Sequence, residues 1–363
     1  MNSDLSIKTF NFFKNKKILI TGDTGFKGSW LSMWLAKLGA RVTGYSLPAE
    51  PHQILAPIIQ KANFLHHIDG DITDPLKVKD LLEKLRPDIV FHLAAQALVR
   101  KSYAKPQLTF ATNLMGSISV LEAVRCSNSV RSLVYITSDK CYLNKELTRG
   151  YHEEDELGGK DPYSASKACA EIAFNSYRES FFNSEQNIGI ASTRAGNVIG
   201  GGDRSADRIV PDTIKSLESK TQIILRNPYA TRPWQYVLDP LYGYMRLAYE
   251  LAFKPKTFSG SWNFGPKEHS IRTVTDLVKI LIQEWGGGKI TNQIDPNAPY
   301  ESTLLHLSSD KAHEKLNWDA LWDFERAAKE SAIWYRDVYN GQDPLEVSQK
   351  QIDAYMSEVS GND

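Results

Sequence analysis

The sequence predicts a doubly wound α/β protein with a second, smaller and mixed C-terminal lobe. Short β-branched runs alternate with amphipathic stretches up to residue 195, and a glycine-rich turn directly follows the first run. The alternation stops after Arg194, where glycine and then Pro, Trp and Tyr become frequent. Strands that alternate with helices are joined by right-handed crossovers, so we expect a parallel sheet with helices on both faces.

The expected strands are bounded by Gly, Pro, Asp or Ser, and they cover residues 17–21, 41–46, 88–93, 132–137 and 188–194. The expected helices carry apolar residues spaced by three and four, and they cover residues 29–38, 75–85, 112–125 and 162–182. One more strand, over residues 261–264, is expected to return to the sheet, and Gly286 to Gly288 form a turn in the second lobe.

The domain boundaries follow from this pattern. We assign residues 1–195 to the sheet domain, together with a segment near 233–250 and a strand near 261–266. Residues 196–232 and 267–363 form the smaller lobe. A chain of 363 residues exceeds the roughly 150 of a single domain, which agrees with two lobes.

Composition excludes several classes of protein. Hydrophobic residues make up 42% and charged residues 24%, as in soluble globular proteins and unlike disordered or fibrous chains. Lys plus Arg and Asp plus Glu each number 43, so no net charge attracts nucleic acid or an anionic membrane. We therefore expect neither as a partner.

The three cysteines, Cys126, Cys141 and Cys169, form no C-x-x-C pair. They predict neither a disulfide framework nor a zinc site, and we expect no metal. No stretch approaches the roughly 18 apolar residues of a membrane-spanning helix. These observations favour a cytoplasmic protein in a reducing compartment.

The turn after the first strand has the spacing G-x-x-G-x-x-G, with Gly22, Gly25 and Gly28. Glycine lets the backbone turn tightly and approach a pyrophosphate, and the N-terminus of the next helix offers free N–H groups. The turn, with Thr24 and Phe26 inside it, therefore predicts a dinucleotide site.

The acidic residue that holds the adenosine ribose in such sites, about 20 positions further on, is missing. The second strand ends instead with Tyr45 and Ser46, and we expect Tyr45 to contact the cofactor. Asp71 and Ile72, after the third strand, are expected to meet the adenine. The choice between NAD and NADP stays open on this evidence.

A phenol and an ammonium stand four residues apart, at Tyr163 and Lys167, in a helix that begins near Pro162. A nearby cation stabilises a phenolate, so Tyr163 is a candidate general base with a lowered pKa. The fifth strand runs into Ser138, Asp139 and Lys140. Ligands of such sheets bind beyond the carboxyl ends of the strands, which makes these three polar residues candidates as well.

In the residues described above, the chain resembles the extended short-chain dehydrogenase/reductases that act on nucleotide sugars. The NAD-binding domain of these enzymes is Rossmann-like. The resemblance covers nearly the whole chain. It rests on the glycine turn, the string His92-Leu93-Ala94-Ala95, Ser138 and Tyr163-x-x-x-Lys167. It implies NAD as the cofactor, with contacts from Leu93, Ala94 and Ala95, a nucleotide-sugar substrate, and a homodimer or higher homo-oligomer.

Longer strings at residues 137–142, 194–203 and 232–238 are similar to the branch of this family that removes water from CDP-glucose. Related dTDP-glucose dehydratases carry Thr-Asp-Glu where this chain has Ser138-Asp139-Lys140, and epimerases of the family lack the Asp. By this resemblance Asp139 indicates dehydration, and Lys140 indicates the CDP-glucose branch.

The resemblance also implies roles. Tyr163 would take the proton of the sugar O4, which Ser138 orients, and a protonated Asp139 would donate to the departing C6 hydroxyl. Lys140, or a water that it holds, would remove the C5 proton. A lysine acts as a base only when neutral, so Lys140 would need a pKa lowered by burial or by cations such as Lys167.

Two arginines of the second lobe, Arg208 and Arg232, are candidates for the substrate diphosphate because a guanidinium makes paired bonds to phosphate. Asn197 matches the substrate-binding Asn of the family. The alternatives are another nucleotide-sugar 4,6-dehydratase, a 4-epimerase of dTDP-, GDP- or UDP-sugars, and a non-catalytic dinucleotide sensor.

Overall fold

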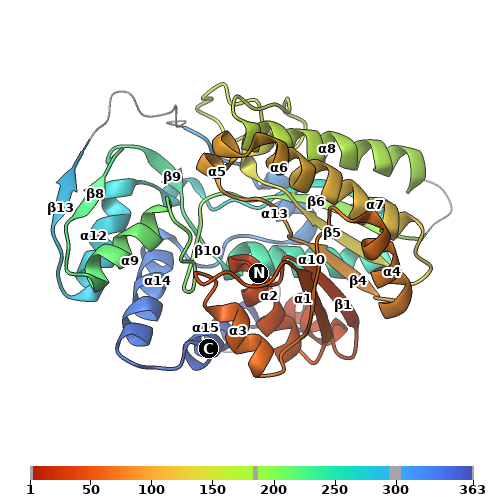
Figure 1. The fold of residues 1–363 in the computed structure, drawn as a ribbon, viewed down its shortest axis with the longest axis horizontal. Helices are drawn as coiled ribbons and strands as arrows, with labels where there is room; N and C mark the ends of the chain where they lie inside the picture. The colour runs from red at the N-terminus through yellow and green to blue at the C-terminus, as the bar shows by residue number, and fades with distance from the viewer. Residues whose placement is uncertain (1–2, 183–186, 294–303, 362–363) are drawn as a thin grey trace.

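The computed structural model describes residues 3–182, 187–293 and 304–361. Residues 183–186 of the expected sheet domain and 294–303 of the expected second lobe therefore lie outside the described residues. The core is a seven-stranded parallel sheet in the order β11-β6-β5-β4-β1-β2-β3 (Figure 1). Its strands are β1 (Lys17–Thr21), β2 (Arg41–Ser46), β3 (His66–Asp69), β4 (Ile89–His92), β5 (Ser132–Ile136), β6 (Gly189–Arg194) and β11 (Gly260–Asn263).

This strand order is that of a doubly wound Rossmann-like sheet. The chain adds strands in one direction from β1 to β3 and in the opposite direction from β4 to β11, so the order of the strands reverses between β1 and β4. The expected fold class is confirmed. Except for the edge strand β3, the strands are mostly buried on both faces, and alternate residues enter two different apolar cores. Leu19 and Val90 pack with one set of helices, whereas their neighbours Ile18, Ile20 and Ile89 pack with the other.

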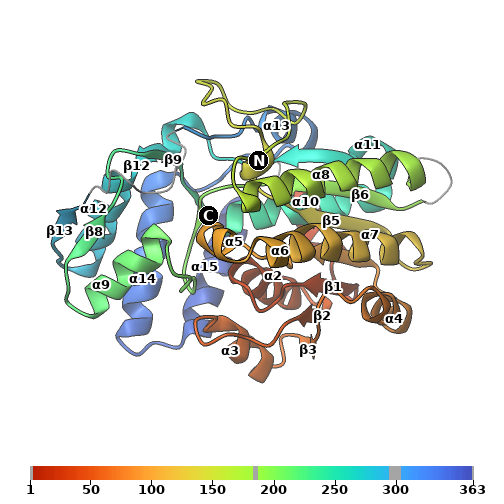
Figure 2. The same cartoon turned by 45° about the horizontal axis from the view of Figure 1, so that its top comes forward.

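The helices divide accordingly between the faces. One face is covered by α4 (Pro75–Leu85), α7 (Ser117–Arg125) and α8 (Pro162–Phe181), which lie together in Figure 2. The other is covered by α2 (Phe26–Lys37) and α10 (Leu238–Phe253), with α15 (Pro344–Val359) beyond them. The remaining helices of the sheet half are α1 (Ser3–Phe12), α3 (Leu55–Lys61), α5 (Val99–Ala104), α6 (Pro106–Phe110), α11 (Pro255–Phe258), the π-helix Ala111–Gly116 and the 3-10 turn Asp139–Cys141.

The second lobe lies beyond the carboxyl edge of the sheet, on the left in Figure 1. It contains three two-stranded pairs, β7 with β10, β8 with β13 and β9 with β12. Their bounds are β7 (Val198–Ile199), β8 (Ile223–Leu225), β9 (Thr231–Pro233), β10 (Gln235–Tyr236), β12 (Ile271–Thr273) and β13 (Ile290–Asn292), with helices α9 (Ile209–Glu218), α12 (Val274–Trp285) and α14 (Phe324–Tyr339) and the 3-10 turn Glu268–Ser270. Helix α13 (Asp310–Leu316) packs instead against β11 and α10 of the sheet half.

The strand expected to return to the sheet near residue 261 is present as β11, which pairs with β6. The turn expected at Gly286 is also present, since Gly286 ends α12 with a φ of 97°. The proposed division into residue ranges stays a prediction, because one apolar core continues from the sheet face into α9, α12 and α14.

Two expected helices differ from the structure. The helix expected from residue 29 begins at Phe26, because the glycine turn already has helical hydrogen bonds from Ser29 N to Gly25 O. The helix expected at 112–125 is split into the π-helix and α7, a change that periodicity cannot reveal because the apolar spacing continues through it. No helix among the described residues is long and apolar enough to cross a membrane.

Candidate active site

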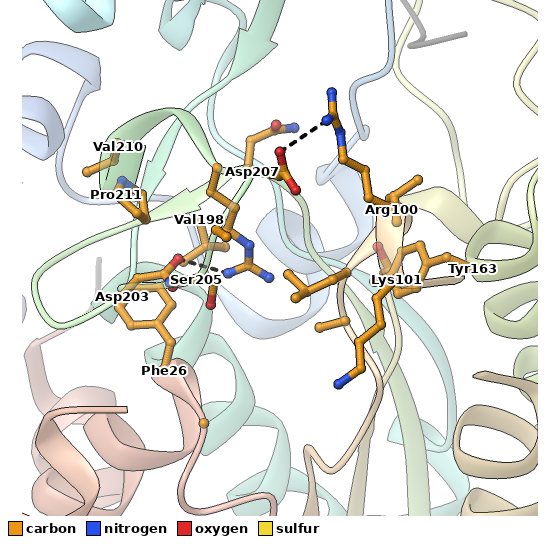
Figure 3. Close-up of a pocket in the computed structure, with 18 of the residues that line it drawn as sticks. Phe26, Arg100, Lys101, Tyr163, Val198, Asp203, Ser205, Asp207, Val210 and Pro211 are labelled. Carbon is orange, nitrogen blue, oxygen red and sulfur yellow. Dashed lines mark hydrogen bonds and ion pairs between the residues drawn. The ribbon is translucent and has the colours of Figure 1, made fainter. Parts of the chain in front are cut away.

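A large cleft lies between the carboxyl edge of the sheet and the second lobe, with a volume of about 2060 Å³. Its walls come from the loops after β1, β2, β4, β5 and β6 and, opposite them, from the segments around α9 and β8. Figure 3 shows Tyr163 on one side of this cleft, with Phe26 and Asp203 on the other. This is the edge at which ligands of doubly wound sheets bind.

The glycine turn forms one end of the cleft. A Cβ on Gly22 would lie 2.6 Å from the Ala94 nitrogen, and one on Gly28 would lie 2.1 Å from the Gly22 oxygen, so both positions exclude a side chain. Gly22 also has a φ of 78°, which favours glycine. Helix α2 begins at this turn without a side-chain cap, so its first N–H groups stay available to an anion. The turn therefore fits a dinucleotide pyrophosphate.

Most of the other expected cofactor residues also line the cleft, namely Thr24, Gly25, Phe26, Asp71, Ile72, Leu93, Ala94 and Ala95. Tyr45 is the exception, because it is 3% exposed and is absent from the cleft wall. Its ring fills the space beside Gly70, and its hydroxyl donates to the Asp71 carbonyl at 3.3 Å. The expectation that Tyr45 touches the cofactor is not supported. The Tyr45 side chain instead packs against the turn at residues 70–71 and stabilises it.

The loop after β5 brings Ser138, Asp139 and Lys140 to the cleft wall. Ser138 Oγ donates to Asp139 Oδ1 at 2.8 Å and accepts the Lys140 N–H at 3.3 Å. The Asp139 carboxylate is 3% exposed and occupies the place where a Cβ of Gly196 would lie, 2.1 Å from its Oδ2. A glycine at 196 is thus required for this carboxylate to lie where it does.

Tyr163 and Lys167 stand one turn apart in the first turns of α8, whose start is capped by Asp161. Burial raises the pKa of Tyr163 to about 12, against the lowering effect of the Ser138 hydroxyl beside it. The expected low phenol pKa is therefore absent in the structure, because burial outweighs the surrounding donors and cations. Burial also lowers the pKa of Lys167 to about 8, with Glu171 opposing the shift.

Lys27 is a cleft residue that the sequence analysis missed. It lies inside the glycine turn, lines the cleft, and holds its ammonium 5.9 Å above the Tyr244 ring. Burial lowers its pKa to about 8, with further lowering by Arg208 and Lys167 and an opposing effect of Asp139. Among the described residues no carboxylate lies within ion-pair distance of it. In the G-x-x-G-x-x-G pattern its position is one of the unspecified ones, so the pattern itself gives no signal for a lysine there.

Asn113 is a second missed residue. It sits in the π-helix, buried, and its amide bonds Ser166 Oγ of α8 at 2.9 Å and both the carbonyl and the N–H of Gln96. It thereby ties the helix that carries Tyr163 to the loop after β4. Irregular helical turns of this kind are frequent at functional sites, but no sequence pattern predicts them.

At the other end of the cleft the second lobe contributes Asn197, Arg208 and Arg232. Arg208 Nη1 donates to Asp203 Oδ2 at 2.8 Å, and its charge reaches the Tyr163 phenol. Asn197 has a φ of 50°, an unusual conformation for a non-glycine residue and one that is enriched at binding sites. The two lobes also touch across the cleft through Arg100 and Asp207, 3.3 Å apart (Figure 3).

His92, at the end of β4, is a structural residue rather than a ligand-binding one. Its Nδ1 bonds Thr21 Oγ1 at 2.7 Å and its Nε2 bonds Ser117 Oγ at 2.9 Å, so both ring nitrogens are used inside the fold. Within the three described ranges no cluster of His, Cys, Asp and Glu is placed to hold a metal ion.

The fold and the cleft together define a class: a doubly wound α/β protein with a dinucleotide-type glycine turn facing a serine, tyrosine and lysine. Comparison with known proteins makes the class specific. The sequence model described as GDP-mannose 4,6 dehydratase matches residues 19–331. The chain therefore belongs to the GDP-mannose 4,6-dehydratase family.

Three known proteins are similar to this chain along nearly the whole length of both chains. The CDP-glucose 4,6-dehydratase of Salmonella typhimurium is 42% identical over 351 residues, covering 96% of this chain and 98% of that protein. An epimerase of Methanothermobacter thermautotrophicus has a similar structure, with a TM-score of 0.81, 22% identity and coverage of 95% and 98% of the two chains. The dTDP-glucose 4,6-dehydratase of Bacillus anthracis, solved with NAD, has a TM-score of 0.73 at 19% identity and coverage of 90% and 99%.

Proposed function

We propose that the protein converts CDP-glucose to CDP-4-keto-6-deoxyglucose with loss of water, using bound NAD. The observation that carries the proposal is the 42% identity, over nearly the full length of both chains, to a CDP-glucose 4,6-dehydratase. The cleft supports it, because the residues that such a reaction needs meet there at one sheet edge. The protein is then an NAD-dependent hydro-lyase.

When bound, NAD supplies a hydride acceptor for oxidation at the sugar C4 and returns the hydride at C6, so the reaction has no net redox change. Tyr163 accepts the O4 proton in this proposal, and Ser138, beside its phenol, orients the same hydroxyl. With a phenol pKa of about 12 in the buried site, a positive charge next to it favours this transfer. Arg208 acts on the phenol in this way, and Lys167 stands one helical turn from Tyr163.

Elimination needs an acid at the C6 hydroxyl and a base at C5. We assign the acid to Asp139, whose buried carboxyl accepts from Ser138, and the base to Lys140 or to a water that it holds. The proton leaves C5, the C6 hydroxyl departs as water, and the double bond between C5 and C6 forms. Hydride then adds at C6 and a proton at C5.

The diphosphate of the substrate is assigned to the second lobe. Arg208 and Arg232 reach the cleft, and a planar guanidinium bonds two phosphate oxygens at once. Asp203 fixes the orientation of Arg208 through its 2.8 Å bond, which lowers the entropy lost when the substrate binds. Asn197 completes this end of the site.

We also infer a cytoplasmic protein that works as a homodimer or higher homo-oligomer. Three cysteines without a disulfide, one buried, one exposed and one between, fit a reducing compartment. Exposed apolar side chains lie at Met115 in the π-helix before α7 and at Ile172 and Phe181 on α8, which fits a helix-paired dimer.

The test is incubation with CDP-glucose, dTDP-glucose, GDP-mannose and UDP-glucose, each with NAD or NADP, followed by the mass of the product. Loss of one water from CDP-glucose with NAD is the expected result. Loss of water from another donor keeps the mechanism and changes the substrate, whereas an unchanged mass with an inverted C4 centre makes the protein an epimerase. NAD binding without any turnover makes it a sensor.

A further inference from the structure

A buried acid lies behind the part of the cleft where the usual ribose-binding acid is missing. Asp23, the residue after Gly22, is 1% exposed. Its Oδ1 accepts the Ser46 hydroxyl at 3.0 Å, and its Oδ2 lies 2.7 Å from His67 Nδ1. His67 in turn reaches Asp69 Oδ1 through Nε2 at 3.0 Å. The carboxylate is thus held from two sides by partners from the ends of β2 and β3.

The surrounding fold makes room for this carboxylate. A Cβ on Gly44, in the middle of β2, would lie 2.2 Å from both the Asp23 Cγ and its Oδ2. Any other residue at position 44 would therefore push the carboxyl group out of its place. Burial raises the pKa of Asp23, and the adjoining His67 opposes this shift. The same carboxylate, against the effect of burial, raises the pKa of His67.

The hydrogen bonds around Asp23 fix where the hydroxyl protons point. A carboxylate accepts only, so the Ser46 proton lies on the bond to Asp23. The Thr24 hydroxyl is 3.0 Å from the Ser46 oxygen and must then be the donor of that bond. The Leu47 carbonyl, 3.2 Å from the Ser46 oxygen and 3.4 Å from the Thr24 oxygen, is a second acceptor within reach of both hydroxyls. Both hydroxyl protons are therefore engaged by acceptors of the protein itself.

Thr24 and Ser46 themselves line the cleft. With their protons engaged in these hydrogen bonds, the two hydroxyls offer oxygen lone pairs to a ligand rather than donors. Such a wall accepts hydrogen bonds from a hydroxyl group and repels a phosphate, which is itself only an acceptor near neutral pH. The cleft-lining residues that follow in residues 47–55 include Glu50 and no Lys or Arg that could neutralise a phosphate.

Ser46 ends β2, which is the place where a doubly wound dinucleotide site contacts the adenosine ribose. We propose that Asp23, acting through Ser46 and Thr24, selects a dinucleotide whose adenosine ribose carries a free 2′-hydroxyl and rejects one with a 2′-phosphate. This proposal rests on the proposed function for the presence of a dinucleotide. Asp23 is a positioning residue in it, because the two hydroxyls contact the ligand and Asp23 does not.

The experiment measures dissociation constants of NAD and of NADP by calorimetry, on full-length protein freed of nucleotide. The readout is the ratio of the NADP constant to the NAD constant. The wild type is expected to bind NAD at least about tenfold more tightly. Asp23→Ala, which removes the acceptor and frees the Ser46 proton to face the cleft, is expected to lower the ratio by about tenfold.

Asp69→Asn is the matched control. It also removes a carboxylate that bonds His67, but the Asp69 side chain is 67% exposed and has no bond to either hydroxyl, so the ratio should stay within about twofold of the wild type. If Asp23→Ala does not fold, Ser46→Ala carries the same test, because it cuts the chain of hydrogen bonds while Asp23 stays in place. A merely structural role of Asp23 would weaken the binding of both dinucleotides equally.

Three outcomes decide the matter. A ratio that falls in the Asp23 or Ser46 variant and stays unchanged in the Asp69 variant supports the proposal. Wild-type protein that binds NADP as tightly as NAD, or an Asp23→Ala variant with an unchanged ratio, overturns it while the proposed dehydratase stands. Binding of neither dinucleotide rejects the proposed function itself.

Discussion

Glu171 and Arg194 form an ion pair in which both side chains are almost completely buried, with exposed fractions of 0% and 1% and 2.7 Å between Oε2 and Nη2. Glu171 lies one turn after Lys167 on α8, and Arg194 ends β6 just before the Asn197 loop. Arg194 also bonds the Tyr142 hydroxyl at 2.6 Å. The pair therefore connects α8, the end of β6 and the loop after β5, and each of these three segments carries residues of the cleft.

Arg194→Met is expected to destabilise the protein by about 3–5 kcal/mol, because it leaves the Glu171 carboxylate buried without its cation. The measurement is urea unfolding at neutral pH. The double variant Arg194→Met with Glu171→Gln is expected to recover part of the loss, since it leaves no uncompensated charge. A cost below about 1 kcal/mol for the single variant would contradict the assignment.

Lys27→Met is expected to raise stability and lower ligand affinity at the same time. Its folded-state pKa of about 8 lies below the ordinary 10.5, so at pH 7 the folded protein holds a charge that burial disfavours. This penalty is complete below pH 8 and disappears as the pH rises toward 10.5, and the methionine removes it. The cleft also loses one of its cations, so NAD binding should weaken by about fivefold or more.

The measurements for Lys27→Met are the thermal midpoint at pH 7 and the NAD dissociation constant. Lys8→Met is the control, because it removes the same charge from an exposed position on α1. A variant that is both less stable and unchanged in affinity would show that Lys27 is an ordinary structural residue. Equal effects of the two variants on affinity would assign the change to net charge alone.

The sequence predicts the central strands well because β-branched and apolar residues fill strands that are buried on both faces, such as β4 and β5. The cleft residues that end those strands, such as Ser138, are predictable for the same reason. The edge strand β3, His66–Asp69, is polar and largely unburied, and no apolar run marks its bounds. The residues that were missed lie in the glycine turn, in the first turn of α2 and in the π-helix. The place of the Asp23 carboxylate depends on the space at Gly44, which a linear pattern does not reveal.

Tyr45 is a predicted cofactor residue that the structure buries away from the cleft wall. The end of β2 is the correct place for a ribose contact, but strand side chains alternate, and the burial of Tyr45 beneath Gly70 leaves Ser46 facing the cleft. Which of two successive residues faces the ligand depends on the register with β3, where Tyr45 pairs with Ile68. A change of register by one residue would exchange their roles.

The roles of Asp139 and Lys140 predict two separable defects. Asp139→Asn should lower dehydration by about a hundredfold or more, because an amide cannot protonate the leaving hydroxyl. Lys140→Ala should lower it by a similar factor and slow the exchange of the C5 hydrogen with solvent. The measurements are turnover of CDP-glucose and incorporation of deuterium from heavy water. Wild-type turnover in both variants would show that the acid and the base lie elsewhere.

Retention of the cofactor is a further prediction. The ribose site lacks a carboxylate that touches the ligand directly, since Asp23 acts from behind Ser46. Protein freed of nucleotide is therefore expected to lose activity and to regain it on addition of NAD. Full activity after exhaustive removal of the nucleotide, verified by absorbance of the denatured protein, would contradict this expectation.

Asp239 predicts how stability depends on pH. It is buried in α10, and its Oδ1 accepts the Leu321 N–H at 2.6 Å and the Tyr355 hydroxyl at 2.8 Å, which fastens the C-terminal helices to the sheet. Burial raises its pKa from 3.8 to about 7. The folded state therefore binds a proton that the unfolded state has already lost, and the stability from this group is present below pH 4 and lost as the pH rises to about 7.

Asp239→Asn keeps an oxygen for both donors and cannot ionise, so the variant is expected to lose this decline of stability between pH 4 and 7 and to unfold at a higher temperature than the wild type at pH 8. The measurement is the thermal midpoint of both proteins from pH 5 to 8. Parallel curves for the two proteins over that range would place the titration in another group. A variant less stable than the wild type at pH 8 would contradict this prediction. It would mean that the negative charge of Asp239 strengthens the hydrogen bonds from Leu321 and Tyr355 by more than burial of the charge costs.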